Sequence, residues 1–294
     1  MSSPEKDPRV VLAPNPSPLT GPGTNTFLLG RREVAVIDPG PDMAGHREAI
    51  LAEVARGGGR ISHIFVTHAH LDHSPGARIL ADLTGAPVLA FGDADSGRSP
   101  AMTRLLEQGE IGGGEGIDRA FSPDIALADG AGVETAEWRL EALHTPGHFG
   151  NHLSFIHGDQ VFCGDVVLGW ASTLISPPDG DLADYMRSLA KLDALDARRL
   201  LPAHGAPIEA PRNRLHELAR HRRARTAQVL AALRESPGTA GELAKRIYEV
   251  GPELIQAASR NVLAHLVALG DLGAVHNDGN LTENSVFYTS DARM

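Results

Sequence analysis

The sequence predicts an α+β fold in two parts, a layered domain of sheets and helices at residues 1–210 and a smaller domain at residues 211–294. Up to about residue 210, short apolar runs typical of strands alternate with runs of helical spacing, which indicates sheets covered by helices. After that point the alternation gives way to three helical runs followed by a hairpin pattern. With 294 residues, 42% of them hydrophobic, the chain is long enough to bury a large core.

The first part is expected to contain both strands and helices in mixed order. Strands are expected at residues 26–29, 33–38, 61–67, 88–91, 138–144, 153–157, 161–163 and 199–201. Helices are expected at residues 46–56, 76–84, 102–108 and 182–195. The segment 92–129 is rich in Gly, Asp and Ser, and its length fits either a lid or binding loop or a plain surface insertion.

The second part begins with one long helix at residues 212–235 that carries a basic face. Thr239 and Glu242 have the spacing of a capping box, so a second helix should start there. A third helix is expected at residues 252–270, because proline suits its first position and glycine its end. Residues 277–280 have the composition of a hairpin turn. Three helices and a hairpin in this order are the layout of a winged helix.

Composition excludes several classes of protein. The net charge of −10 argues against a general binder of nucleic acids or anionic membranes, although residues 211–294 alone hold eleven basic and nine acidic residues. A single cysteine, Cys163, excludes an intramolecular disulfide framework. The first twenty residues lack a secretory apolar stretch, and no run approaches the roughly eighteen apolar residues that span a bilayer. We therefore expect a cytoplasmic protein with no membrane partner.

Four potential metal ligands follow the strand expected at residues 61–67. They are His68, His70, Asp72 and His73, and imidazole and carboxylate are groups that zinc, iron and manganese accept. Four ligands within six residues would crowd one ion, which argues for two. Three later residues, His148, Asp165 and His204, repeat the arrangement of a strand followed by a ligand. Strand ends on one sheet edge converge, so these residues are expected to join the same site.

Together with Asp38, these residues resemble the successive signature motifs of the metallo-β-lactamase superfamily over residues 20–210. The resemblance implies a four-layer αββα sandwich with a site for two divalent metal ions, zinc first and iron or manganese as alternatives. It implies that one ion takes His68, His70 and His148, that the other takes Asp72, His73 and His204, and that Asp165 bridges them. Asp38 matches a residue that supports the ligands.

The chain also resembles the β-lactamase-like protein 2 group, which carries a C-terminal winged helix. The matching segments are NPSP at 15–18, GTNT at 23–26, GDVVLG at 164–169, DYMRSL at 184–189 and HRRAR at 221–225. That group includes an endoribonuclease of single-stranded RNA and many members of unknown substrate. Pro75 departs from the glycine of many relatives, which stiffens the loop of His73 but leaves every ligand in place.

The resemblance implies a hydrolase in which two cations share a water and lower its pKa to about 7, so that a bridging hydroxide attacks a carbonyl or phosphorus. Asp72 and Asp165 are the expected catalytic residues, with Asp72 as proton acceptor. The general acid cannot be read from the sequence; His144 and His152 are expected to make structural hydrogen bonds, and Cys163 to be buried. Antibiotic hydrolysis is rejected, because the main zinc β-lactamases have cysteine at the position of Asp165.

Three substrate hypotheses remain. Single-stranded RNA is favoured by the resemblance and by a run of arginines, Arg220, Arg222, Arg223 and Arg225, which could equally be a solvated helix face. A small-molecule ester or thioester, as in glyoxalase II-like relatives, ranks slightly lower. A DNA-binding regulator is disfavoured, because residues 253–269 offer one fixed cation, Arg260, to a recognition helix. Packing or formation of a homodimer is the expected role of the winged helix.

Overall fold

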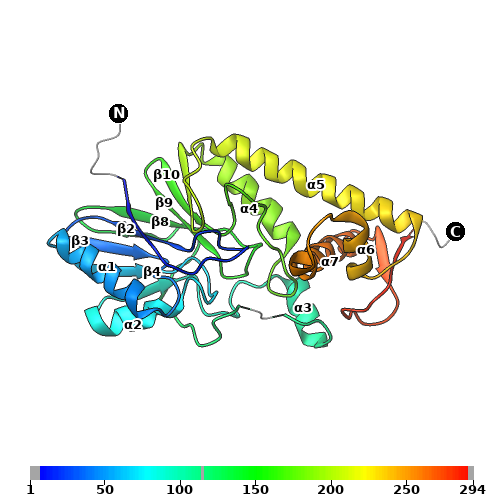
Figure 1. Cartoon of the computed structure of the whole chain (residues 1–294), viewed down its shortest axis with the longest axis horizontal. Coiled ribbons are helices and arrows are strands. Elements are labelled where there is room, and N and C mark those ends of the chain that lie inside the picture. The colour runs from blue at the N-terminus through cyan, green and yellow to red at the C-terminus, as the bar shows by residue number, and fades with distance from the viewer. Residues whose placement is uncertain (1–6, 114–115, 291–294) are drawn as a thin grey trace.

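The computed structural model describes residues 7–113 and 116–290. Two sheets form its larger part (Figure 1). The first has the order β1 (Arg9–Leu12), β2 (Asn25–Leu29), β3 (Glu33–Ile37), β4 (Arg60–Phe65), β5 (Val88–Ala90) and β6 (Ile125–Ala126). The second has the order β11 (Arg199–Pro202), β10 (Gln160–Gly164), β9 (Leu153–His157), β8 (Arg139–His144) and β7 (Gly132–Glu134). The short strands β1, β6 and β7 were not predicted, because a run of two to four residues is too short to show a strand period.

Alternating side chains of the strands build the layers. In β4, Ile64 packs toward the helices and the adjacent Phe65 packs toward the second sheet, as the two-residue period of a strand requires. Helices α1 (Ala44–Arg56) and α2 (Pro75–Thr84) cover the outer face of the first sheet. Helix α4 (Leu182–Ala194) and the first half of α5 (Pro211–Glu235) cover the second. The expected four-layer αββα sandwich is confirmed.

The C-terminal part has the predicted order of a winged helix. Helix α6 (Ala240–Ile247) starts at the predicted capping box, in which Thr239 and Glu242 bond each other's backbone. The third helix differs from expectation, because residues Pro252–Leu254 form a 3₁₀ turn before α7 (Ile255–Asp271) begins. The prediction of a tight turn at 277–280 was wrong, because a longer loop joins β12 (Val275–Asn277) to β13 (Phe287–Thr289).

Two helices tie the parts of the molecule together. Met102 and Leu105 of α3 (Pro100–Gln108) are buried in the core of the winged helix, so this piece of segment 92–129 is a packing element. Helix α5 runs along both parts (Figure 1): Leu215 lies in the core behind the second sheet and Val229 in the winged-helix core. A domain boundary at 210/211, which stays a prediction, would fall where this shared helix starts. No helix in the described ranges is both long and apolar enough to cross a bilayer.

Candidate metal centre

The seven predicted ligands lie in loops that each follow a strand. His68, His70, Asp72 and His73 follow β4, His148 follows β8, Asp165 follows β10, and His204 follows β11. Among the described residues they form overlapping groups whose ligand atoms all lie within 4.8 Å of one another. We call His68, His70 and His148 the three-histidine group, and Asp72, His73 and His204 the aspartate group. A third set, His68, His73 and Asp165, links the two groups.

The three-histidine group brings one ring nitrogen of each histidine close together. His70 Nδ1 lies 2.8 Å from His68 Nε2 and 3.1 Å from His148 Nε2. The outer nitrogens have other partners: His68 Nδ1 lies 3.0 Å from the Thr67 hydroxyl, and His148 Nδ1 lies 2.7 Å from the Leu174 carbonyl. A proton on each outer nitrogen leaves lone pairs on the inner ones. Burial lowers the pKa of His70 to about 3 and that of His68 well below its ordinary value, so these rings are neutral, as metal ligation requires.

The aspartate group combines imidazole with carboxylate. Asp72 Oδ2 lies 3.4 Å from His73 Nε2 and 3.3 Å from His204 Nε2. Burial opposes a charge on these rings, but neighbouring carboxylates, above all Asp165 and Asp72, raise the pKa of His204 to about 10 and that of His73 well above its ordinary value. Burial likewise opposes ionisation of Asp72, yet His73 and His204 hold its pKa low. The group therefore favours an ionised Asp72 beside protonated His73 and His204. A metal cation that binds here can take the place of the protons on these two rings.

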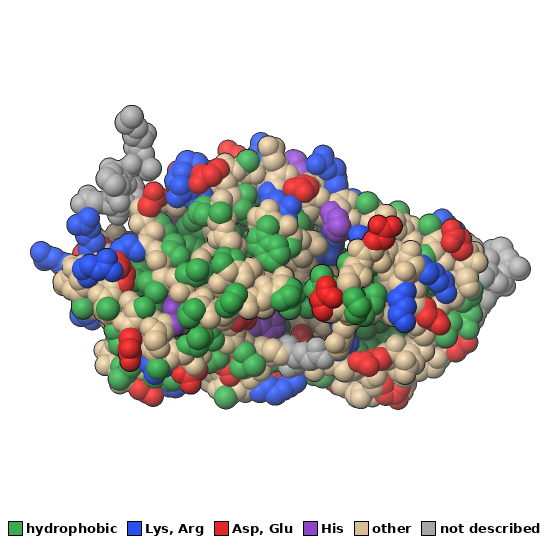
Figure 2. All heavy atoms as spheres, in the orientation of Figure 1, with side chains coloured by type: hydrophobic (Ala, Val, Ile, Leu, Met, Phe, Trp, Pro, Cys, Tyr) green, Lys and Arg blue, Asp and Glu red, His purple; other side chains and the backbone are tan. Residues whose placement is uncertain are grey.

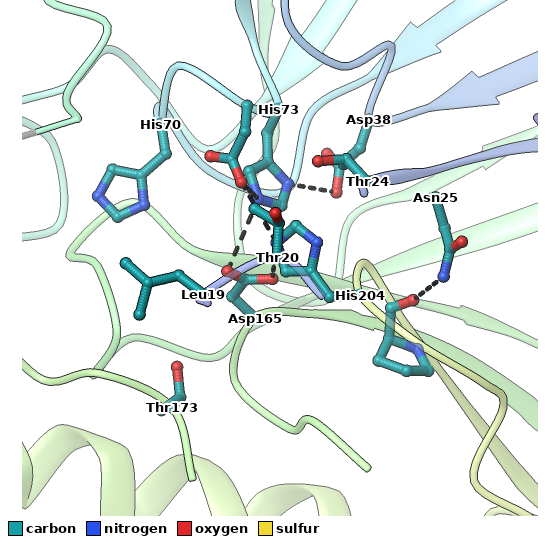
Figure 3. Close-up of polar contacts among 12 residues, drawn as sticks. Leu19, Thr20, Thr24, Asn25, Asp38, His70, His73, Asp165, Thr173 and His204 are labelled. Atoms are coloured by element: carbon teal, nitrogen blue, oxygen red, sulfur yellow. Dashed lines mark hydrogen bonds and ion pairs between the residues drawn. The ribbon is translucent and has the colours of Figure 1, made fainter. Parts of the chain in front are cut away.

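Asp165 contacts residues of both groups, and Figure 3 shows its carboxylate beside His73 and His204. Its carboxylate is 3.7 Å from both His73 Nε2 and His148 Nε2, and 3.3 Å from His204 Nε2. Asp165 Oδ1 and His73 Nε2 are buried and have no hydrogen-bond partner among the described residues. Leaving such atoms unpaired costs about 1–3 kcal/mol each, so the donor set fits divalent metal ions that would satisfy them.

Asp38 supports both groups from behind, as expected. Its carboxylate accepts hydrogen bonds from Thr67 N at 2.7 Å and Thr67 Oγ1 at 2.8 Å, and lies 3.0 Å from His73 Nδ1. The Thr67 hydroxyl then meets His68, so one carboxylate orients a ring of each group. Asp38 is 2% exposed and has a positive φ of 50°, a conformation that aspartate tolerates better than most residues.

The sequence did not reveal two further supports. His152 contacts Thr145 through Nδ1 at 3.0 Å, and its Nε2 accepts the backbone N–H of Asp165 at 3.2 Å. Asn151 accepts the N–H of Ala69 at 3.3 Å and thereby steadies the loop between His68 and His70. Both are fully buried. Their position just after His148 was the available signal, and for His152 only a structural bond was inferred from it.

The other histidine and the cysteine behave as predicted. His144 bonds the Gly150 carbonyl at 2.9 Å and stacks on Phe91. Cys163 is buried, and burial beside Asp165 raises the pKa of its thiol. Neither residue is an activated nucleophile or a free acid.

A cavity of about 330 Å³ opens onto the centre. Its walls are mostly apolar: Pro18, Leu19, Leu71, Leu168, Trp170, Ala171 and Leu174. Figure 3 shows Leu19 and Thr173 beside the cluster of His70, Asp165 and His204. No lysine or arginine is among the described residues that line this cavity, and its ionisable residues all belong to the two groups or to Asp165. In Figure 2, basic side chains are scattered over this face, at its left end, along its upper and lower edges and toward its right end.

The arginine run of α5 is not one surface. Arg222 is 1% exposed, and Arg225 stacks over Tyr248 with its guanidinium carbon 3.9 Å from the ring centre. Arg220 and Arg223 are exposed, but they line a separate groove between α4 and α5. The four arginines therefore form neither a single RNA-binding face nor a single solvated helix face, because Arg222 is buried and Arg225 packs on Tyr248.

The sequence pattern of the metallo-beta-lactamase superfamily matches residues 19–204, more than half of the chain. The chain belongs to the metallo-β-lactamase superfamily. As an enzyme of this superfamily it is a metal-dependent hydrolase, since that is the typical activity of its members. The beta-lactamase associated winged helix domain matches residues 239–282, which agrees with the fold of this part.

Known relatives of this superfamily protein differ in their names. A beta-lactamase-like protein 2 homolog of Caenorhabditis elegans is 30% identical over 91% of this chain and 85% of its own length. An atrochrysone carboxyl ACP thioesterase of Aspergillus fumigatus is 32% identical over 77% of this chain, which spans 65% of the thioesterase. A metallo-beta-lactamase family protein of Thermus thermophilus, of known crystal structure, has a TM-score of 0.77 and 29% identity over 96% of this chain and 98% of its own.

Proposed function

We propose that this enzyme hydrolyses thioesters with two divalent metal ions. The three-histidine group would hold one ion and the aspartate group the other, with Asp165 between them. Nitrogen and carboxylate ligands in these numbers suit zinc, with iron or manganese as alternatives. When bound, two such ions lower the pKa of a shared water toward about 7 and stabilise negative charge on the attacked carbonyl oxygen.

The side chains then have separate tasks. Asp72 is 28% exposed at the cavity and ionised, so it can accept the proton of the attacking water. Asp165 and the rings around it hold the reacting groups in place. Water adds its oxygen to the acyl carbon, the carbon–sulfur bond breaks, and a carboxylic acid and a thiol leave.

One observation carries the choice of thioester: the cavity is apolar and contains no ionisable residue outside the ligand groups and Asp165. A thiol has a pKa near 8.5, so it leaves as an anion without a general acid, whereas an alcohol or ribose oxygen needs one. The apolar walls fit an acyl chain. The thioesterase relative supports the same choice.

Single-stranded RNA is the weaker candidate. Neutralising phosphates needs several free basic residues beside the reacting groups. The exposed Arg220 and Arg223 line a different groove. Arg260 lines a second cavity of about 210 Å³ beside His70 and His148, where it shares the wall with Asp179 and Glu253. A DNA-binding role is weaker still. Arg260, the cation of the third helix, donates to the Gly112 carbonyl and lies 3.7 Å from Glu283, so it is engaged within the protein.

The test compares both substrates on one preparation. Zinc-loaded enzyme and Asp72→Ala are incubated with acyl thioesters of N-acetylcysteamine and coenzyme A, while thiol release is followed, and with end-labelled single-stranded RNA. We expect thiol release by the wild type alone. Cleavage of RNA without thiol release would overturn the proposal and restore the nuclease interpretation.

A further inference from the structure

One wall of the cavity is formed by an irregular segment, residues 168–175, which we call the strap. It has no helix or strand of its own. The strap reaches the metal centre through His148: the Leu174 carbonyl lies 2.7 Å and the Thr173 hydroxyl 3.2 Å from His148 Nδ1. These contacts place the proton on Nδ1 and turn Nε2 toward His70. The orientation of this ring therefore depends on where the strap lies.

Two helices of the C-terminal part hold the strap from behind. Arg222 of α5 donates to the Thr173 carbonyl and, at 3.1 Å, to the side-chain oxygen of Asn261 on α7. The same Asn261 oxygen accepts the backbone N–H of Ile175 at 3.2 Å. The bonds thus bracket Leu174, the residue whose carbonyl meets His148.

The other end of the strap is fastened separately. Arg214, two turns earlier on α5, donates to the Leu168 carbonyl at 2.8 Å and the Ala171 carbonyl at 2.6 Å. Among the described residues, its hydrogen-bond and ion-pair partners are Leu168, Ala171 and Glu217, none of which contacts His148. Arg214 and Arg222 therefore provide two fastenings of one wall, of which only the second reaches the metal centre.

Burying the charged side chain of Arg222 costs free energy, and packing alone does not explain why an arginine occupies this position. It is 1% exposed, none of the ion pairs among the described residues includes it, and its Nε has no hydrogen-bond partner there. Its guanidinium carbon lies 5.2 Å from the centre of the Tyr185 ring. A buried charge without an ion partner costs several kcal/mol unless it is fully hydrogen-bonded, so an apolar side chain would pack more cheaply here. What an apolar side chain cannot do is donate to the strap.

We propose that Arg222 and Asn261 are positioning residues for His148, and that the winged-helix part thereby completes the three-histidine group. This inference rests on the assignment of His148 as a metal ligand under the proposed function. It also gives the winged helix a role that needs no nucleic acid. Supports of this kind typically change metal affinity 10- to 100-fold when they are removed.

The test measures zinc affinity by competition with a chelator, and the ligand field of the cobalt-substituted protein by its visible spectrum. Asn261→Ala removes the acceptor of both bonds from a half-buried position, so the fold should survive. We expect it to bind zinc at the three-histidine group 10- to 100-fold more weakly, with an altered cobalt spectrum. Asn261→Asp keeps an oxygen for both bonds and should retain wild-type affinity.

Two controls separate positioning from packing. Ser259→Ala, on the same helix, removes a hydroxyl that bonds only the Ile255 carbonyl, and should change neither readout. Arg214→Met loosens the far end of the strap and should raise KM while leaving zinc affinity unchanged. Arg222→Met should reproduce the zinc effect of Asn261→Ala.

The outcomes are distinct. If Asn261→Ala melts lower but binds zinc as tightly as the wild type, the residue only packs and the proposal is wrong. If even His148→Ala leaves zinc affinity unchanged, the ligand assignment fails, and the inference falls with it. Weak zinc binding by His148→Ala together with wild-type binding by Asn261→Ala would overturn the inference alone.

Discussion

The three-histidine group and the aspartate group share one site but are stabilised by opposite electrostatics. In the first, burial drives protons off the rings, and the pKa of His70 falls to about 3. In the second, carboxylates overcome burial, and the pKa of His204 rises to about 10. The first group is therefore ready to ligate a cation at neutral pH, whereas the second must release protons first. Two neighbouring groups of three potential ligands therefore differ in the protonation state from which each would bind a metal ion.

The largest effect is expected from Asp72→Ala, which should remove the aspartate group from this comparison. Asp72 contacts His73 and His204 but no ring of the three-histidine group, so one group should be lost and the other kept. We expect kcat/KM to fall about 10³-fold or more, because two-metal chemistry needs both ions. Metal analysis should drop from about two zinc ions per chain to about one. Asp82→Ala, an exposed change on α2, is the matched control, and loss of both ions from Asp72→Ala would contradict the division into groups.

Asp38→Asn should weaken both groups at once. The amide cannot accept from both the Thr67 backbone and its hydroxyl while also holding His73, so zinc affinity should fall roughly 10- to 100-fold at each group. Thr67→Val removes the partner of His68 and one of the hydrogen bonds that Asp38 accepts, but it leaves the contact between Asp38 and His73, so it should weaken the three-histidine group more than the aspartate group. Competition titrations on the wild type and on both variants measure this. Equal losses at both groups in Thr67→Val would show that the two groups are not supported separately.

Proton release sharpens the comparison further. At pH 7 the raised pKa values of His73 and His204 mean that zinc must displace protons there, whereas the neutral three-histidine group has none to lose. Calorimetric titration in buffers of different ionisation enthalpy should detect proton release in the wild type. Asp72→Ala, which keeps the three-histidine group, should bind its remaining ion with little or no release. Undiminished release in that variant would show that the protons come from elsewhere.

The smallest effect concerns His265, a buried imidazole in the winged-helix core that resembles His70 without any metal role. Burial lowers its pKa to about 3, and Thr226 lies 2.9 Å from its Nδ1. Between pH 7 and 5 the unfolded chain takes up a proton that the folded chain refuses, so stability falls as pH falls, by about 2 kcal/mol. Denaturant titrations of His265→Gln should show a pH dependence smaller by that amount. An unchanged dependence would mean that His265 is charged in the folded protein.

The sequence predicted which residues come together at the proposed metal centre, because the pattern that marks them is local. A strand followed by histidine or aspartate recurs four times, and the strand ends of one sandwich lie near one another. The proximity of His68, His148, Asp165 and His204 could therefore be predicted from the sequence alone. The layered fold could also be predicted from the sequence, because apolar runs of period two and helical runs alternate along the first part.

What could not be predicted depends on contacts between distant segments. Arg222 looked like a surface cation because it stands in a run of arginines, and only the packing of α5 on the strap shows that it is buried. Asn261 carries no motif at all. The long loop between β12 and β13 was missed because the composition of residues 277–280 suits a tight turn, while the ladder resumes only at Phe287.

Zinc titration of metal-depleted enzyme, followed by anomalous diffraction of its crystals, tests the central claim most directly. The account predicts about two ions per chain, one beside His70 and His148 and the other beside Asp72 and His204, with Asp165 between them. A single ion that spans both groups, or full saturation with no zinc at either group, would contradict it.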